Sequence, residues 1–172
     1  MALAGTALLA LSACGGGPSR SAAPHASPVG HAVQQQAAGR CTAAHLRPAV
    51  AGSEGAAGSV YYDLTLTNTG SAACVLKGYP GVSLIQRDGS TVGAPATREG
   101  GKGAPVTLAP GRAAHTTLHT LNEGVSDAGC WRGHDLIKIY PPGSYDPLTL
   151  RDSHVRVCGG RFTVTAMTVS RA

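Results

Sequence analysis

The residues of this 172-residue chain that are most able to form bonds with one another or with a ligand are its five cysteines. Four of them, Cys41, Cys74, Cys130 and Cys158, can be joined as two disulfides, with three connectivities open. We favour the pairs that are neighbours in sequence, Cys41–Cys74 and Cys130–Cys158. One alternative is a four-cysteine zinc site, but the chain has no Cys-x-x-Cys pair to form a chelating turn. The other is four reduced core thiols, which suit a cytosolic protein.

The fifth cysteine, Cys14, follows a short apolar segment. Residues 2–13 carry no charged side chain and end in Leu-Ser-Ala directly before Cys14. The segment is shorter than the ~20 apolar residues of a bilayer-spanning helix, but it fits the hydrophobic region of a signal peptide. Its ending resembles the bacterial lipobox, in which the thiol receives a lipid and cleavage occurs just before the cysteine. We predict a lipoprotein signal peptide over residues 1–13; a short buried helix that ends in Cys is the alternative.

The start of the chain departs from a complete signal peptide. Secretory signals normally open with Lys or Arg, whereas the first basic residue here is Arg20. We therefore expect a basic segment upstream of Met1. Residues 14–40, with the lipidated Cys14 at their start, are rich in Gly, Pro, Ala, Ser and Gln. Such a segment cannot bury enough apolar surface to offset its ordering entropy, which predicts a flexible linker.

Two histidines four residues apart, His115 and His119, are the strongest candidates for metal binding. On a helix they would share one face at chelating distance. The threonines around them favour a strand, where the two imidazoles share a face but lie about 13 Å apart. We therefore interpret them as exposed strand histidines and predict no metal site.

Sequence motifs for catalysis are absent. The chain has no Gly-x-Ser-x-Gly nucleophile turn. Its nine acidic residues are scattered, mostly beside Gly or Pro, although two carboxyls could still meet in the folded protein. Residues 100–103, Gly-Gly-Lys-Gly, lack the full P-loop spacing and indicate a mobile loop. We expect no enzyme activity and no cofactor.

One loop could carry recognition, because Trp131, Arg132 and His134 follow Cys130 directly. Trp and Arg are enriched at binding hot spots. The alternative is that Trp131 plugs the end of the domain over the Cys130 disulfide, and we favour this interpretation of Trp131.

The elements that must position these residues are short strands. From Val60 to Thr67, apolar and polar side chains alternate, which is typical of a strand with one buried face. Similar short runs are separated by Gly- and Pro-containing turns. The predicted strands are Leu46–Val50, Val60–Asn68, Cys74–Lys77, Val82–Arg87, Val106–Leu108, Ala113–Leu121, Leu136–Tyr140, His154–Cys158 and Phe162–Ser170.

About eight or nine strands over residues 41–172 predict an all-β domain, an immunoglobulin-like antiparallel β-sandwich. The formal charge of +5 is spread thinly, with no run of three basic residues, so we expect no nucleic-acid partner. A mild attraction to anionic head groups or cell-wall polymers is a tendency of the whole surface.

Four segments of the domain form a recognisable set: Leu64–Gly70, Cys74–Val82, Thr107–Gly111 and Ile139–Gly143. Together they resemble the domain of unknown function family DUF4232. The resemblance spans about residues 41–170, and its most specific part is Asn-Thr-Gly, then Cys, then Gly-Tyr-Pro-Gly. Members are mostly exported proteins and lipoproteins of actinobacteria, which implies the same address here. The family has no established activity, so the resemblance implies no catalytic residues.

These observations predict a lipid-anchored protein on the extracytoplasmic face of the cell membrane. We expect a non-enzymatic binding or adaptor domain whose partner is a cell-envelope protein or polymer. One alternative is a cell-envelope hydrolase or metal-dependent enzyme whose acids or histidines converge only in the folded protein. Another is a structural role without a specific ligand. The sequence indicates no oligomeric state.

Overall fold

The computed structural model describes residues 38–169 and is all-β, with one 3-10 turn and no α-helix in that part of the chain. The all-β prediction is confirmed, but the strands number thirteen rather than eight or nine. The elements are β1 (Gly39–Arg40), η1 (Ala43–His45), β2 (Leu46–Ala56), β3 (Ser59–Asn68), β4 (Cys74–Leu76), β5 (Gly81–Ile85), β6 (Thr91–Val92), β7 (Thr97–Arg98), β8 (Val106–Leu108), β9 (Ala113–Leu121), β10 (Leu136–Tyr140), β11 (Leu148–Arg151), β12 (Thr163–Val164) and β13 (Thr168–Val169). The predicted signal peptide, Cys14 and most of the linker lie outside the described residues.

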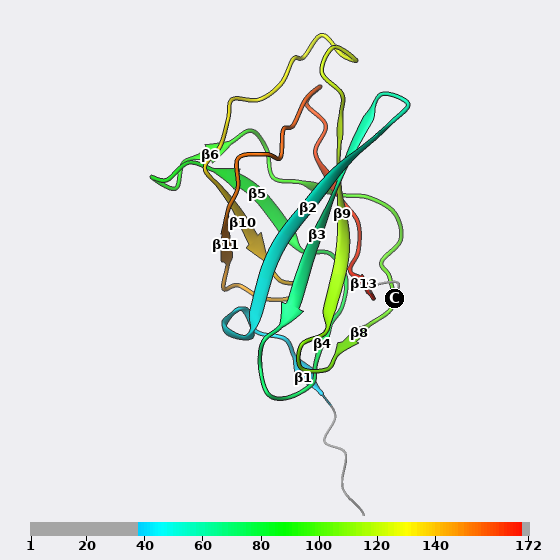
Figure 1. Cartoon of the computed structure of the whole chain (residues 1–172), viewed down its shortest axis with the longest axis vertical. Helices are drawn as coiled ribbons and strands as arrows, with labels where there is room; N and C mark the ends of the chain where they lie inside the picture. The colour runs from blue at the N-terminus through cyan, green and yellow to red at the C-terminus, as the bar shows by residue number, and fades with distance from the viewer. Residues whose placement is uncertain (1–37, 170–172) are drawn as a thin grey trace, which may run out of the picture. The chain divides into compact units, whose positions relative to one another are not determined.

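The strands form three sheets (Figure 1). The largest has the order β2-β3-β9-β12-β7, with β13 also paired to β9. The second has the order β11-β10-β5-β6, and the third is the small sheet β1-β4-β8. The described part of the chain contains no helical segment that could span a bilayer.

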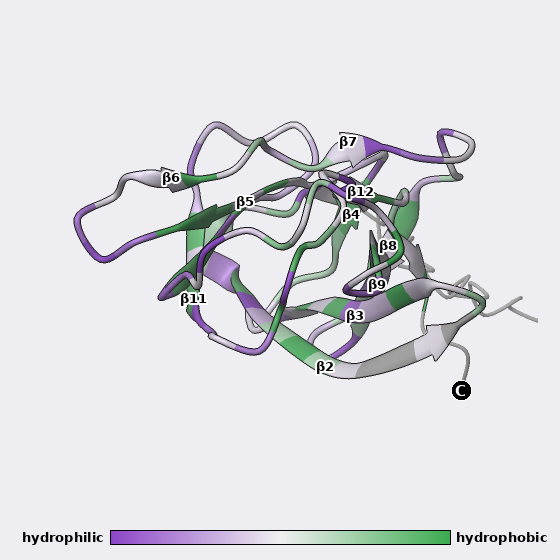
Figure 2. Cartoon of the chain, turned by 90° about the horizontal axis from the view of Figure 1, so that it is seen from above, coloured by the Kyte–Doolittle hydropathy of each residue, from purple (hydrophilic) through white to green (hydrophobic). Residues whose placement is uncertain are grey.

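The core is built by the period-two alternation of the long strands. On β3, Tyr62, Leu64 and Leu66 are buried, and Ile137 and Ile139 of β10 are fully buried in the same hydrophobic cluster. Because alternate residues of a strand point to opposite faces, each sheet contributes one apolar face to this core. Figure 2 shows the complementary pattern, with hydrophilic residues gathered in loops such as the one between β5 and β6.

The prediction of a strand over His154–Cys158 is wrong, apart from a single bridge between Cys158 and Cys130. The alternation was real, because Val155 and Val157 are buried. Side chains, however, take the backbone hydrogen bonds that a neighbouring strand would have made. Arg156 N donates to the Tyr62 hydroxyl at 3.0 Å, and Cys158 N donates to Thr120 Oγ1 at 2.9 Å.

The single strand predicted over Phe162–Ser170 is split into two. Thr163 pairs with His119 and Thr168 pairs with His115, so the register against β9 shifts by one residue between them. Met167 is diverted from the ladder, because its N–H donates to Gly78 O at 2.9 Å. A bulge of this kind cannot be read from an apolar run.

The sheets are also not purely antiparallel, since β1 pairs with β4 and β12 pairs with β7 in parallel. Each of these pairings joins segments that are distant in sequence. The two-residue strands β1, β6 and β7, together with β11, were missed because runs this short carry too little periodicity to be recognised.

Candidate functional site

A cleft of about 470 Å³ lies between two loop segments, 131–134 and 153–157. The segments are joined at their base by the Cys130–Cys158 disulfide. Trp131 N also donates to Val157 O at 2.8 Å. The walls of this cleft are therefore fixed by a covalent bond and a backbone hydrogen bond, although neither wall is a regular strand.

Trp131 is a packed wall of the cleft. It is half-buried, and its ring meets the edge of Phe162 with centroids 5.9 Å apart and planes at 81°. It also lies against Gly93, where a Cβ would overlap the indole. The contact requires glycine at position 93, whose φ of 68° is in addition left-handed. This geometry matches the plug alternative for Trp131.

His134 lies beneath the loop with a side chain only 2% exposed. Its Nε2 has no hydrogen-bond partner in the described part of the chain. The nearest carboxylate oxygen, Asp152 Oδ1, is 3.7 Å away and accepts from the backbone N–H groups of His154 and Val155, each at 2.9 Å. Burial lowers the pKa of His134 below its ordinary value, although the Asp152 and Asp135 carboxylates oppose the shift. His134 is therefore a neutral, buried residue at pH 7.

Two arginines and one histidine are exposed at the rim of the cleft. Arg132 is exposed, and the side chains of His154 and Arg156 are 90% and 60% exposed. Arg156 Nη2 is 2.9 Å from Glu123 Oε1, so part of its charge is balanced. Arg132 has no such partner among the described residues. The rim can therefore attract an anionic group, with Trp131 as the rigid apolar wall beside it.

Protonation of His134 should destabilise the domain. The unfolded histidine titrates near pH 6.5, whereas the folded pKa is lower, so the unfolded state binds the extra proton first. Stability is then fully present above about pH 6.5 and falls as the pH drops toward the folded pKa. Urea unfolding of the wild type between pH 7.5 and 5 should show this fall, and His134→Gln should flatten it. The exposed His154→Gln should keep the wild-type slope; equal slopes in all three proteins would show that His134 does not carry the effect.

A second polar cluster lies on the outer face of the largest sheet. Ser59 Oγ is 3.1 Å from His119 Nε2, and His119 Nδ1 is 3.1 Å from Glu99 Oε2. Because a carboxylate can only accept, Nδ1 carries a proton, and Nε2 of the neutral imidazole then accepts from the Ser59 hydroxyl. This is the order of contacts in a serine–histidine–acid triad.

The same cluster is also tightly packed. Tyr61 stacks on the His119 ring, with centroids 4.7 Å apart and planes at 20°. Thr163 Oγ1 donates to Glu99 Oε2. The hydrogen bonds from Thr163 and His119 lower the pKa of Glu99, so its carboxylate is charged at neutral pH.

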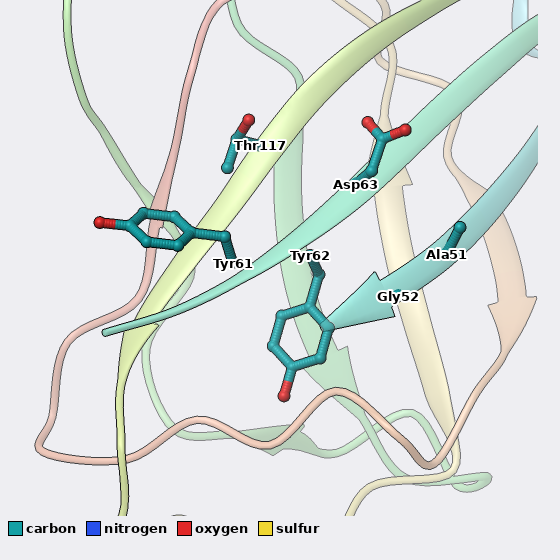
Figure 3. Close-up of a pocket in the computed structure, with 6 residues that line it drawn as sticks. All are labelled: Ala51, Gly52, Tyr61, Tyr62, Asp63 and Thr117. Carbon is teal, nitrogen blue, oxygen red and sulfur yellow. The ribbon is translucent and has the colours of Figure 1, made fainter. Parts of the chain in front are cut away.

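A shallow hollow of about 330 Å³ opens on this face beside Tyr61 and Thr117 (Figure 3). Figure 3 shows Tyr61 and Thr117 on the adjacent strands β3 and β9, with Tyr62 turned away from Tyr61. Ser59 is not among the residues that line the hollow. The stacked Tyr61 therefore lies between this hollow and the His119 ring.

The prediction that His115 and His119 are strand residues is correct, because both lie on β9. The prediction that both are exposed is wrong for His119, which is only 6% exposed, and His115 is half-buried. Neighbours on the sheet's outer face cover it, above all the Tyr61 ring. His115 Nδ1 donates to Asp63 Oδ2 at 2.7 Å, so the two imidazoles have separate carboxylate partners. Within the described residues, no three His, Cys, Asp or Glu side chains are grouped to hold a metal ion.

The family model of the domain of unknown function DUF4232 matches residues 41–168. The chain belongs to the DUF4232 family. No curated protein and no solved structure matches this DUF4232 chain. The match covers both loop segments of the cleft and all three residues of the Ser59 cluster.

The most specific DUF4232 segment has a structural explanation at Asn68. This side chain is buried, and its Nδ2 donates to Ala72 O at 2.9 Å and to Leu108 O at 3.0 Å. Its Oδ1 accepts from Gly70 N at 2.9 Å. The Asn-Thr-Gly sequence therefore closes the turn after β3 and ties it to β8, away from the cleft.

The residues singled out in the sequence of this DUF4232 domain are partly brought together. The structure joins Cys41 to Cys74 and Cys130 to Cys158, the pairs favoured from sequence. The segment from Trp131 to His134 forms one wall of the cleft.

Two sets of residues were not predicted from the sequence. At the opposite wall of the cleft they are Asp152, Ser153, His154 and Arg156. Around His119 they are Ser59 and Glu99. The sequence pointed to the opposite wall only through the predicted Cys130–Cys158 disulfide, which links this wall to the segment 131–134. No sequence motif indicated Ser59, because Glu99 and His119 are 40 and 60 positions away from it along the chain.

Proposed function

We propose that this DUF4232 protein is a lipid-anchored, extracytoplasmic binding module without enzyme activity. Two disulfides suit an oxidising compartment outside the cytoplasm. The lipid anchor is inferred from the lipobox-like sequence at Cys14. We further propose that the sheets form a variant of the immunoglobulin-like sandwich, in which loops at the ends of the sheets serve recognition.

The observation that carries the binding proposal is the cleft between residues 131–134 and 153–157. Its walls are tied together before any partner arrives, which lowers the ordering cost of binding. Arg132 projects at the rim beside the packed Trp131, a combination of residue types that is common at binding hot spots. The partner that this chemistry fits is a cell-envelope protein or polymer with an anionic group.

Cross-linking on intact membranes tests the site. A photoreactive residue at position 154, where the side chain is 90% exposed, should capture a discrete partner. Adding Arg132→Ala should reduce that product about tenfold or more, because a charged contact at a hot spot is lost. Arg151→Ala is the matched control, since Arg151 is also exposed and without a salt bridge among the described residues. Equal losses for Arg132→Ala and Arg151→Ala would contradict recognition at the cleft.

Replacement of Cys14 by Ser tests the anchor separately. The variant lacks the thiol that accepts the lipid, so it should leave membranes that are washed with concentrated salt and should fail to partition into detergent. The wild-type protein expressed with an upstream basic segment provides the reference. If the Cys14→Ser protein partitions like the wild type, the lipoprotein assignment is wrong.

A second candidate function, a cell-envelope hydrolase, is favoured by the contacts of Ser59, His119 and Glu99. In such an enzyme the Ser59 Oγ would attack an acyl carbon while His119 Nε2 takes its proton. A fluorophosphonate probe tests this directly, because an activated serine displaces fluoride from phosphorus and becomes labelled. Labelling that disappears in Ser59→Ala would support the hydrolase. Absence of labelling in the wild type would leave the cluster as a packing feature of the sheet.

A further inference from the structure

A second cleft, of about 520 Å³, is lined by three cationic side chains and no acidic one. Its lining residues are Lys77, Gly78, Tyr79, Arg98, Gly100, Lys102 and Gly143. None of its three cations forms a salt bridge with a carboxylate of the described residues. The positive charge of this cleft is therefore uncompensated, in contrast to the thin spread of charge over the chain as a whole.

The cleft is held in shape by aromatic and backbone contacts. The Arg98 guanidinium lies over the Tyr79 ring at 5.6 Å from its centroid. The Tyr79 hydroxyl donates to Gly100 O at 2.5 Å, which fixes the glycine-rich loop that carries Lys102. A fourth cation, Arg40, donates to Gly143 O at 2.6 Å on the cleft's edge. The sequence Gly-Gly-Lys-Gly thus contributes one lysine to a preformed basic site.

The location of the cleft is as informative as its charge. Lys77 directly follows β4, and Arg40 belongs to β1, the first strand after the segment that leads from the predicted anchor. Figure 1 shows β1, β4 and β8 at one end of the domain and the loop after β9 at the other. Tyr145, two residues beyond Gly143, is 96% exposed. Exposed tyrosines are favoured at the level of lipid head groups, where one end of the ring is apolar and the other wet.

We propose that this basic cleft binds the phosphate groups of anionic phospholipids at the surface of the anchoring membrane. Lys77, Arg98 and Lys102 provide the charge, and Tyr145 provides an interfacial contact. The biological setting rests on the proposed lipid anchor, but the binding chemistry does not require an acyl chain. Docking through this end directs the loop after β9, which leads to Trp131, away from the membrane.

Vesicle flotation of the full chain carrying Cys14→Ser tests the proposal without any lipid anchor. The protein should bind phosphatidylcholine vesicles that contain phosphatidylglycerol and should not bind pure phosphatidylcholine vesicles. Each cation removed should weaken binding about fivefold, so Lys77→Gln/Arg98→Gln/Lys102→Gln should weaken it on the order of a hundredfold. Tyr145→Ser should produce a smaller loss.

The matched control removes three exposed cations elsewhere, with Arg47→Gln/Arg112→Gln/Arg151→Gln, and gives the same net charge. Equal weakening by both triple variants would overturn the proposal, because general attraction would then explain binding. Binding of inorganic phosphate in calorimetry without any vesicle binding would also overturn it, in favour of a soluble ligand.

The single Lys102→Glu variant, on an exposed loop, should abolish most vesicle binding at an unchanged melting temperature. Loss of detergent partitioning on the Cys14→Ser change tests the lipid anchor alone. The vesicle result is measured without a lipid anchor and is independent of it.

Discussion

Replacing Trp131 with alanine should lower the free energy of unfolding by about 2–4 kcal/mol, because a packed aromatic ring is removed. Trp131 is half-buried, so we expect less than the full cost of a completely buried tryptophan. The substitution removes the edge-to-face contact with Phe162 and uncovers Gly93. The melting temperature should therefore fall by about 10 °C for a domain of this size.

Tyr145→Ala is the control, because it removes an aromatic ring that is 96% exposed. It should change the free energy of unfolding by less than about 0.5 kcal/mol. Trp131→Phe should retain part of the contact with Phe162 and fall between the two. If Trp131→Ala melts like the wild type, the side chain is not a structural wall, and a direct role in partner contact becomes the better interpretation.

Removing the Cys130–Cys158 disulfide should cost about 3–4 kcal/mol, because each bridge restricts a loop of about 30 residues in the unfolded chain. The two cysteines are 28 positions apart, and 33 positions separate Cys41 from Cys74. The loop-entropy model therefore expects similar losses for the double variants Cys130→Ala/Cys158→Ala and Cys41→Ala/Cys74→Ala. Urea unfolding of the two variants and of the wild type measures them.

Only the Cys130–Cys158 variant should also weaken partner capture, because this bridge ties the two walls of the Trp131 cleft. The Cys41–Cys74 variant is thus a control matched in chemistry and loop length. Peptide mapping under non-reducing conditions checks the pairing itself. A linked peptide that joins Cys41 to Cys158 would contradict both the pairing and the frame of the cleft.

Features that depend on neighbouring residues can be predicted from the sequence of this chain. The alternation on β3, with Leu64 and Leu66 inward, predicts a strand because side chains of a strand alternate between two faces. Turns at glycine and proline are equally local. The family resemblance over the domain is confirmed by the DUF4232 match to residues 41–168. The favoured disulfides followed from neighbouring positions in the chain, and the structure has the same two bridges.

The contacts between polar side chains become visible only in the folded domain. His119 contacts Ser59 on the neighbouring strand β3 and Glu99 after β7, and no local pattern encodes either contact. The segment from His154 to Cys158 has the alternation of a strand, yet Tyr62 and Thr120 satisfy its backbone. A strand needs a partner at hydrogen-bonding distance as well as the right alternation.

The basic cleft shows the same distinction. Lys77, Arg98 and Lys102 stand in three separate segments, and the sequence presented them only as parts of a diffuse positive charge. The packing of Arg98 on Tyr79 and the bond from Tyr79 to Gly100 bring the segments together. The concentration of charge at one site depends on distances between side chains in the folded protein, and these distances cannot be read from the order of residues along the chain.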